Sequence, residues 1–88
     1  MRRYRSPVGE IDIVARRGGL IAFIEVKARR DRTLALEAVS EHQRRRICRA
    51  AEMFIATHPA LAALDFRFDV MVVSPWSLPH HVIDAWRN

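Results

Sequence analysis

A pair of glycines, Gly18-Gly19, divides residues 9–27 into two hydrophobic stretches, and this division constrains the fold more than any other feature of the chain. Before the glycines, charged and apolar residues alternate, as in a strand with one face toward a core. The stretch after them is apolar on both sides almost to its end, which is typical of a central strand. Because a two-residue Gly-Gly loop is a favoured hairpin connection, the sequence predicts a β-hairpin with a buried second strand.

The predicted turn also fixes which residues face one another across the hairpin. With the two glycines as the loop, Arg17 pairs with Leu20. Counting back from that pair places four charged residues on one face: Asp12 opposite Glu25, and Glu10 opposite Lys27. A slip of one residue would send the second strand's charges to the other face.

Two carboxylates directly across a ladder repel each other, and an apolar sheet makes the repulsion more costly. We therefore expect a cation between Asp12 and Glu25, with Mg²⁺ or Mn²⁺ favoured by the oxygen donors and Lys27 close by. Such an ion can activate water and stabilise charge on a phosphate oxygen, so the predicted chemistry is phosphodiester hydrolysis. The alternatives are salt bridges at a sheet edge and a site that binds without cleaving.

The residues of this predicted site resemble a known sequence pattern. Asp12 followed by Glu25-Val26-Lys27 is similar to the D…ExK core of the PD-(D/E)xK nuclease superfamily, which includes type II restriction enzymes and archaeal Holliday-junction resolvases. The longer wording GEIDIVAR, IAFIEVKAR, HQRRR, AAE and RFDVMVV resembles the bacterial YraN-like family of endonuclease-related proteins. This second resemblance covers most of the chain.

The resemblance implies a role for each matching residue. In the metal site, Asp12, Glu25 and the Val26 carbonyl would bind Mg²⁺ or Mn²⁺. Lys27 would orient water or stabilise the phosphorane charge. Glu10 would assist the metal ligands, and Gln43 would position water or substrate. The implied substrate is nucleic acid, DNA before RNA, with structured or branched forms included. The resemblance also implies a homodimer, because cutting two strands needs two sites. A nucleic-acid-binding or assembly module without catalysis is the alternative.

The basic composition agrees with a nucleic-acid partner. The chain carries a net charge of +5, and fourteen of its fifteen basic residues are arginine. Arginine forms forked contacts with phosphate, so this bias favours a phosphate-bearing partner. The expected phosphate contacts are Arg29, Arg30 and Arg32 after the site, with Arg44 and Arg45 on the following helix. Each of them is equally well explained as part of a solvated charged surface.

The remaining chain predicts one helix and three further strands. Ser40 and Gln43 form the S-x-x-Q pattern of a capping box, which begins a helix that ends near Thr57. Gln43 also lies on the apolar stripe of that helix, so it either reaches the site or bonds its own backbone. Strands are expected at residues 2–5, Asp65–Val73 and His80–Trp86.

These elements follow the order β, β, β, α, β, β. That order predicts a single α/β domain, residues 1–88, with a mixed sheet and a packed helix like a restriction-endonuclease-like core that lacks its first helix. Asp69 is expected to have a structural partner such as an arginine, and Cys48 to be a small buried residue. His80 and His81 point to opposite faces of a strand, which disfavours a zinc site. Without a signal peptide or membrane span, the expected location is cytoplasmic.

Overall fold

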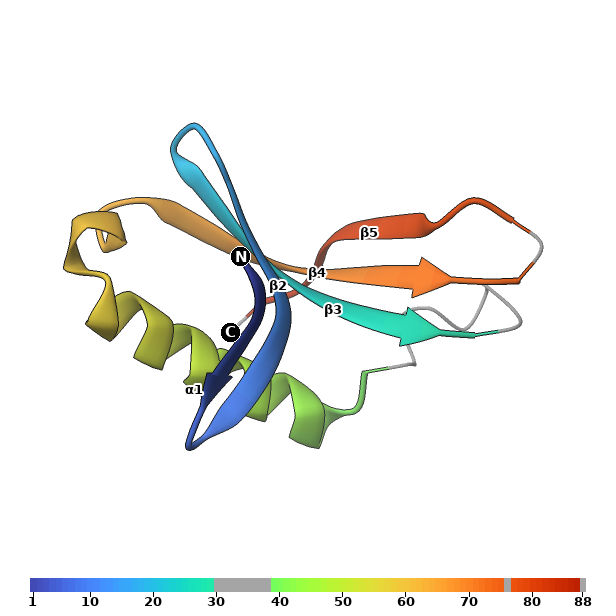
Figure 1. Ribbon diagram of the computed structural model, residues 1–88, viewed down its shortest axis with the longest axis horizontal. Coiled ribbons are helices and arrows are strands. Elements are labelled where there is room, and N and C mark those ends of the chain that lie inside the picture. The colour runs from blue at the N-terminus through green and yellow to red at the C-terminus, as the bar shows by residue number, and fades with distance from the viewer. Residues whose placement is uncertain (30–38, 76, 88) are drawn as a thin grey trace.

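The computed structural model describes residues 1–29, 39–75 and 77–87, which form a five-stranded sheet with one α-helix on one side (Figure 1). The strands are β1 (Arg2–Ser6), β2 (Gly9–Arg17), β3 (Leu20–Ala28), β4 (Asp65–Val73) and β5 (His80–Trp86). The helix α1 spans Glu41–Thr57, and the short 3₁₀ turn η3 spans Pro59–Leu61. Each of these elements was predicted to within a residue or two, apart from η3.

The sheet is mixed, with strand order β1-β2-β3-β4-β5. Neighbouring strands are antiparallel except for the central pair β3 and β4, which is parallel. Antiparallel neighbours need only a short turn, whereas parallel neighbours need a crossover, and α1 lies in that connection. The arrangement is consistent with a restriction-endonuclease-like fold, as the sequence predicted. None of the helices in the described ranges is long and apolar enough to cross a membrane.

The hairpin at the two glycines is confirmed. Arg17 pairs with Leu20, and the ladder continues to the pair Ile13 and Ile24. Of the two glycines, only Gly18 has a positive φ, +58°, which suits a type II′ turn with glycine in its first central position. The ladder pairs end at Ile13, however, so the pairing of Glu10 with Lys27 obtained by counting back does not form.

The helix α1 begins and ends where the sequence predicted. Ser40 and Gln43 exchange the two bonds of the capping box, and Pro59 follows directly after the last turn. The helix buries an apolar stripe: Ile47, Cys48, Ala50, Ala51 and Phe54. Phe54 packs edge-on against Tyr4 of β1 and Phe23 of β3, with ring centroids 5.2 and 5.8 Å away. Burying each large apolar side chain contributes about 1.5–3 kcal/mol, so this contact holds the helix on the sheet.

Gly9, the first residue of β2, allows the close approach of α1 to the sheet. A Cβ atom at this position would lie 3.0 Å from the backbone carbonyl oxygen of Arg46 in α1. The glycine of the GEID segment therefore begins β2 and also leaves the space that α1 needs to pack on the sheet.

Replacing Gly9 with alanine should destabilise the fold by about 1–3 kcal/mol, because a helix backbone in mid-element moves less readily than a flexible side chain. Urea unfolding would measure the change. The matched control is Gly19→Ala, since no atom lies within 4 Å of the Cβ that would be added there. The control should cost no more than about 0.5 kcal/mol. Equal losses in the two variants would contradict the role given to Gly9.

Candidate functional site

Asp12 lies where β2 and β3 stop pairing through their backbones. Beyond Ile13 and Ile24, the backbone N–H of Val26 donates to Asp12 Oδ2 at 2.8 Å. A side-chain carboxylate therefore replaces a backbone carbonyl as the partner of that N–H. The replacement keeps a half-buried backbone donor satisfied while the two strands part.

Glu25 lies beside Asp12, as the hairpin register predicted. Burial, a hydrogen bond to Asp12 and repulsion from the Asp12 charge together raise the pKa of Glu25 from 4.5 to about 8, with burial as the largest cause. The charge of Lys27 and the backbone N–H of Val26 oppose the rise. Two carboxyl groups in contact cannot both ionise easily, so the pair retains a proton near neutral pH unless a cation replaces it.

Lys27 projects from the same face of β3 as Glu25, because the two are separated by one residue of the strand. It is partly buried, and its ammonium group acts on the Glu25 carboxyl. The structure thus brings Asp12, Glu25 and Lys27 together at one place.

The donor set fits a hard divalent cation with an incomplete protein shell. Across the described residues, no group of three or more His, Cys, Asp or Glu side chains could hold a metal ion. Mg²⁺ is commonly bound by one or two carboxylates, with water and substrate phosphate completing its octahedron. Asp12 and Glu25 could therefore hold Mg²⁺ or Mn²⁺ as a pair, and the Val26 carbonyl remains a predicted third ligand.

Two other predicted site residues have different partners. Glu10 lies opposite Arg5 of β1, and its carboxylate is 3.4 Å from Arg5 Nε on the exposed surface. The side-chain oxygen of Gln43 accepts from the backbone N–H of Ser40 at 3.1 Å, which is the capping alternative that the sequence left open. Within the described residues, neither one forms a hydrogen bond or ion pair with Asp12 or Glu25.

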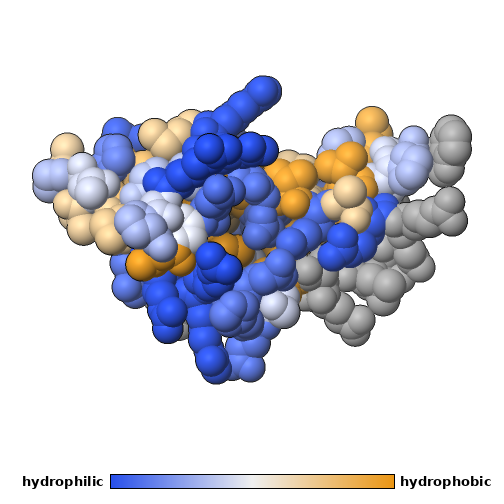
Figure 2. Space-filling view, turned by 60° about the horizontal axis from the view of Figure 1, so that its bottom comes forward, coloured by the Kyte–Doolittle hydropathy of each residue, from blue (hydrophilic) through white to orange (hydrophobic). Residues whose placement is uncertain are grey.

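The predicted phosphate contacts that the structure describes, Arg29, Arg44 and Arg45, have different partners. Arg29 donates to the carbonyl of Ala28, its neighbour in the chain, while Arg30 and Arg32 lie outside the described residues. On α1, Arg45 forms an exposed ion pair with Glu41 at 2.7 Å, and the Arg44 guanidinium lies 5.7 Å from the ring centre of Trp86. Figure 2, which turns the side carrying α1 forward, shows a broad hydrophilic area across the middle of this face.

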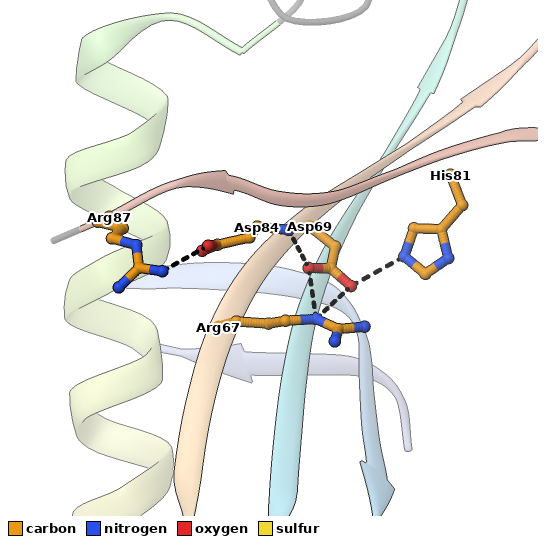
Figure 3. A network of polar contacts seen from close by, with 5 residues as sticks. All are labelled: Arg67, Asp69, His81, Asp84 and Arg87. Atoms are coloured by element: carbon orange, nitrogen blue, oxygen red, sulfur yellow. Dashed lines mark hydrogen bonds and ion pairs between the residues drawn. The ribbon is translucent and has the colours of Figure 1, made fainter.

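Asp69 has the structural role that the sequence favoured. It is fully buried in β4 and pairs in register with Ile24, so it faces away from Glu25. Figure 3 shows its carboxylate accepting from Arg67 Nε, His81 Nε2 and the backbone N–H of Asp84, at 2.8 to 3.2 Å. Burial alone would raise the pKa of Asp69, but these hydrogen bonds lower it below its ordinary value.

This network holds β5 against β4. The ladder between the two strands is irregular between Phe68 and Val70, and Asp84 opposite has a positive φ of 55°. The Asp69 carboxylate binds the backbone N–H of that distorted residue at 2.9 Å, which compensates for the disturbed pairing.

Replacing Asp69 with alanine should lower the free energy of unfolding by about 3–5 kcal/mol, because it strands the partly buried Arg67 charge and a backbone donor. Thermal or urea unfolding would measure the loss. Asp65→Ala, at the exposed start of the same strand, is the matched control and should change stability by less than about 0.5 kcal/mol. A loss below about 1 kcal/mol for Asp69→Ala would refute the conclusion that the Asp69 network holds β5 against β4.

The raised pKa of Glu25 predicts how the metal-free protein responds to pH. Between pH 4.5 and about 8, the folded state keeps a proton that the unfolded state releases. The stability that this proton confers is therefore complete below pH 4.5 and is lost as the pH rises through about 8. Urea midpoints measured in EDTA at pH 5 and pH 8 should fall further for the wild type than for Glu25→Gln. Parallel losses in the two proteins would show that Glu25 is not the titrating group.

Sequence reasoning missed two residues beside this site. Arg2 and Arg3 of β1 line an open hollow of about 590 Å³ together with Asp12, Ile13 and Val26. The run of basic residues before the GEID segment was the available signal. Its meaning depended on the β1 geometry, which the sequence pattern did not reveal.

The cysteine prediction is also confirmed. Cys48 is a free thiol on the buried face of α1, and burial raises its pKa. A raised pKa favours the thiol over the reactive thiolate, so Cys48 acts as a packing residue.

The fold and the acidic pair together define a restriction-endonuclease-like α/β domain with a two-carboxylate site where two central strands part. The chain belongs to the Uncharacterised protein family UPF0102, whose model matches residues 1–73. This membership confirms the resemblance to YraN-like proteins.

Curated relatives from three bacteria illustrate the similarity. The UPF0102 protein of Methylocella silvestris is 54% identical over 84 residues, covering 96% of this chain and 68% of its own length. The UPF0102 proteins of Bradyrhizobium diazoefficiens and Paramagnetospirillum magneticum are 53% and 52% identical, covering 97% and 93% of this chain. This chain spans 64% of the length of each of these last two relatives, a little under two thirds.

Proposed function

We propose that this protein is a metal-dependent nuclease that hydrolyses phosphodiester bonds in nucleic acid, with DNA as the first substrate to test. The observation that carries the proposal is the contact between the carboxyl groups of Asp12 and Glu25, where burial and then the Asp12 contact raise the pKa of Glu25 to about 8. A sheet that needed only stability would gain more from apolar side chains at these positions. Perturbed acid pairs of this kind cluster at functional sites.

Each residue of the site has a role in this proposal. Asp12 and Glu25 would hold Mg²⁺ or Mn²⁺ as ionised carboxylates, with the Val26 carbonyl as a further ligand. Once bound, the ion supplies a polarised water and a positive charge beside the phosphate oxygens. Lys27, close to Glu25, would hold the attacking water or offset the negative charge that builds up on the phosphate.

The partners of two other residues favour a second candidate, a nucleic-acid-binding or assembly module without catalysis. Glu10 is engaged by Arg5, and the side-chain oxygen of Gln43 is used in the capping box. The site therefore has fewer side-chain donors around the acidic pair than the resemblance implies. The same fold could bind nucleic acid through its arginines alone.

The decisive experiment measures cleavage and metal binding with the same variants. In Mg²⁺ or Mn²⁺, we expect cutting of at least one member of a panel of linear, flapped and four-way DNA and the matching RNA. Glu25→Gln and Lys27→Ala should each reduce the cleavage rate by at least about 100-fold, because each removes charge that acts on the transition state. Calorimetry should show Mn²⁺ binding lost in Asp12→Asn and Glu25→Gln.

The control is Glu52→Gln, which neutralises an exposed carboxylate on α1 away from the site. It should leave both cleavage and Mn²⁺ binding unchanged. Binding of nucleic acid without metal-dependent cutting on any substrate would refute the nuclease and support the binding module. The homodimer implied by the resemblance stays a prediction.

A further inference from the structure

We propose that Arg2 and Arg3 form a phosphate-binding cradle beside the acidic pair, which receives a backbone phosphate of the nucleic acid held at Asp12. This inference rests on the proposed function, which identifies the bound ligand as nucleic acid. The two arginines line one open hollow with Asp12, Ile13 and Val26. Its volume of about 590 Å³ is within the range of small-ligand sites, roughly 300–1,000 Å³.

The backbone of β1 is distorted at the position that forms the cradle. Arg2 pairs with Ile13 and Tyr4 pairs with Ile11. Arg3, which lies between them on β1, is therefore the residue that falls opposite Asp12 on β2. Arg3 has a positive φ of 50°, which is uncommon for a residue other than glycine. Such strain is kept where surrounding structure or function requires it.

This distortion lies next to a hollow that both arginines line. Adjacent residues of a regular strand project to opposite faces of the sheet. Arg2 and Arg3 nevertheless line the same hollow, and the positive φ of Arg3 is a break in the regular strand at that point. Both arginines therefore border the same hollow as Asp12.

The charges of the cradle are available to an anion. Within residues 1–29, 39–75 and 77–87, neither Arg2 nor Arg3 has a side-chain hydrogen bond or ion pair, whereas Arg5 on the same strand pairs with Glu10. The nearby Asp12 carboxylate accepts from the Val26 N–H instead. Arginine forks match the geometry of phosphate oxygens, so a phosphodiester is the ligand class that fits two such groups beside a metal site.

The test compares two double variants that remove the same charge. Arg2→Gln/Arg3→Gln removes the cradle, and Arg16→Gln/Arg17→Gln removes two adjacent exposed arginines at the hairpin end of β2. Affinity for a fluorescent 20-base-pair DNA would be measured by anisotropy in EDTA over a range of salt concentrations. We expect the cradle variant to lose about 10-fold or more in affinity and its salt slope to fall by about 2, near 0.9 for each phosphate contact. The control should lose about 3-fold or less, because its charges act only at long range.

A third variant separates binding from folding. Arg3→Gly removes one guanidinium but suits the positive φ, so its urea midpoint should equal or exceed that of the wild type while DNA affinity falls. Arg3→Lys keeps the charge without the fork and should recover only part of the affinity.

The outcomes also separate this inference from the proposed function. Equal losses in the two double variants, or a wild type that binds neither DNA nor RNA, would overturn the cradle. Selective loss of binding in the cradle variant with no cutting by the wild type would support the cradle and refute the nuclease. If the wild type cuts, the cradle variant should raise KM more than it lowers kcat, and an unchanged KM would overturn the cradle.

Discussion

The candidate site depends on one hydrogen bond, which the backbone N–H of Val26 donates to the Asp12 carboxylate. At 2.8 Å it replaces a ladder bond at the point where the backbones of β2 and β3 stop pairing. Without a carboxylate there, the half-buried N–H would lose its partner or the strands would have to close. The same bond holds Asp12 next to Glu25. One hydrogen bond therefore both satisfies the backbone where the strands part and positions the acidic pair.

The rest of the fold keeps this pair of strands in place. On one side of the sheet, α1 rests against β1 and β2, where Gly9 leaves room for the carbonyl of Arg46. On the other side, the buried carboxylate of Asp69 ties β4 to β5 through Arg67 and His81. Strand alternation assigns Glu25 and Asp69 to opposite faces, so two acids that look alike in sequence have different partners.

Much of the fold could be predicted from local signals, each with its own physical reason. The Gly-Gly turn fixed the register as far as Ile13, and the capping box together with Pro59 fixed both ends of α1. The contact between Asp12 and Glu25 followed from that register. These signals were reliable because turn geometry and caps are determined by a few neighbouring residues.

The positions that sequence reasoning could not determine depend on structure beyond the local pattern. Gln43 satisfied two patterns at once, a cap and a sheet-facing stripe, and the reciprocal local bonds with Ser40 decided between them. The partners of Asp69 include Asp84, fifteen residues away, whose N–H is turned inward by an irregular ladder. The cradle at Arg3 was missed for the same reason, since a positive φ on a strand leaves no mark in the alternation of residues.

The two distorted positions of the sheet differ in a way that bears on function. At Asp84, the positive φ is compensated because its N–H binds a buried carboxylate, so the distortion completes a network inside the protein. Arg3 also has a positive φ and lines an open hollow, and within the part of the chain that the structure describes its side chain has no protein anion as a partner. Backbone strain of this kind costs on the order of 1–3 kcal/mol and persists only if something offsets it. A bound phosphate, attracted by both arginines and by a cation at Asp12, would offset the backbone strain at Arg3. The Asp69 carboxylate offsets the strain at Asp84 in the same way.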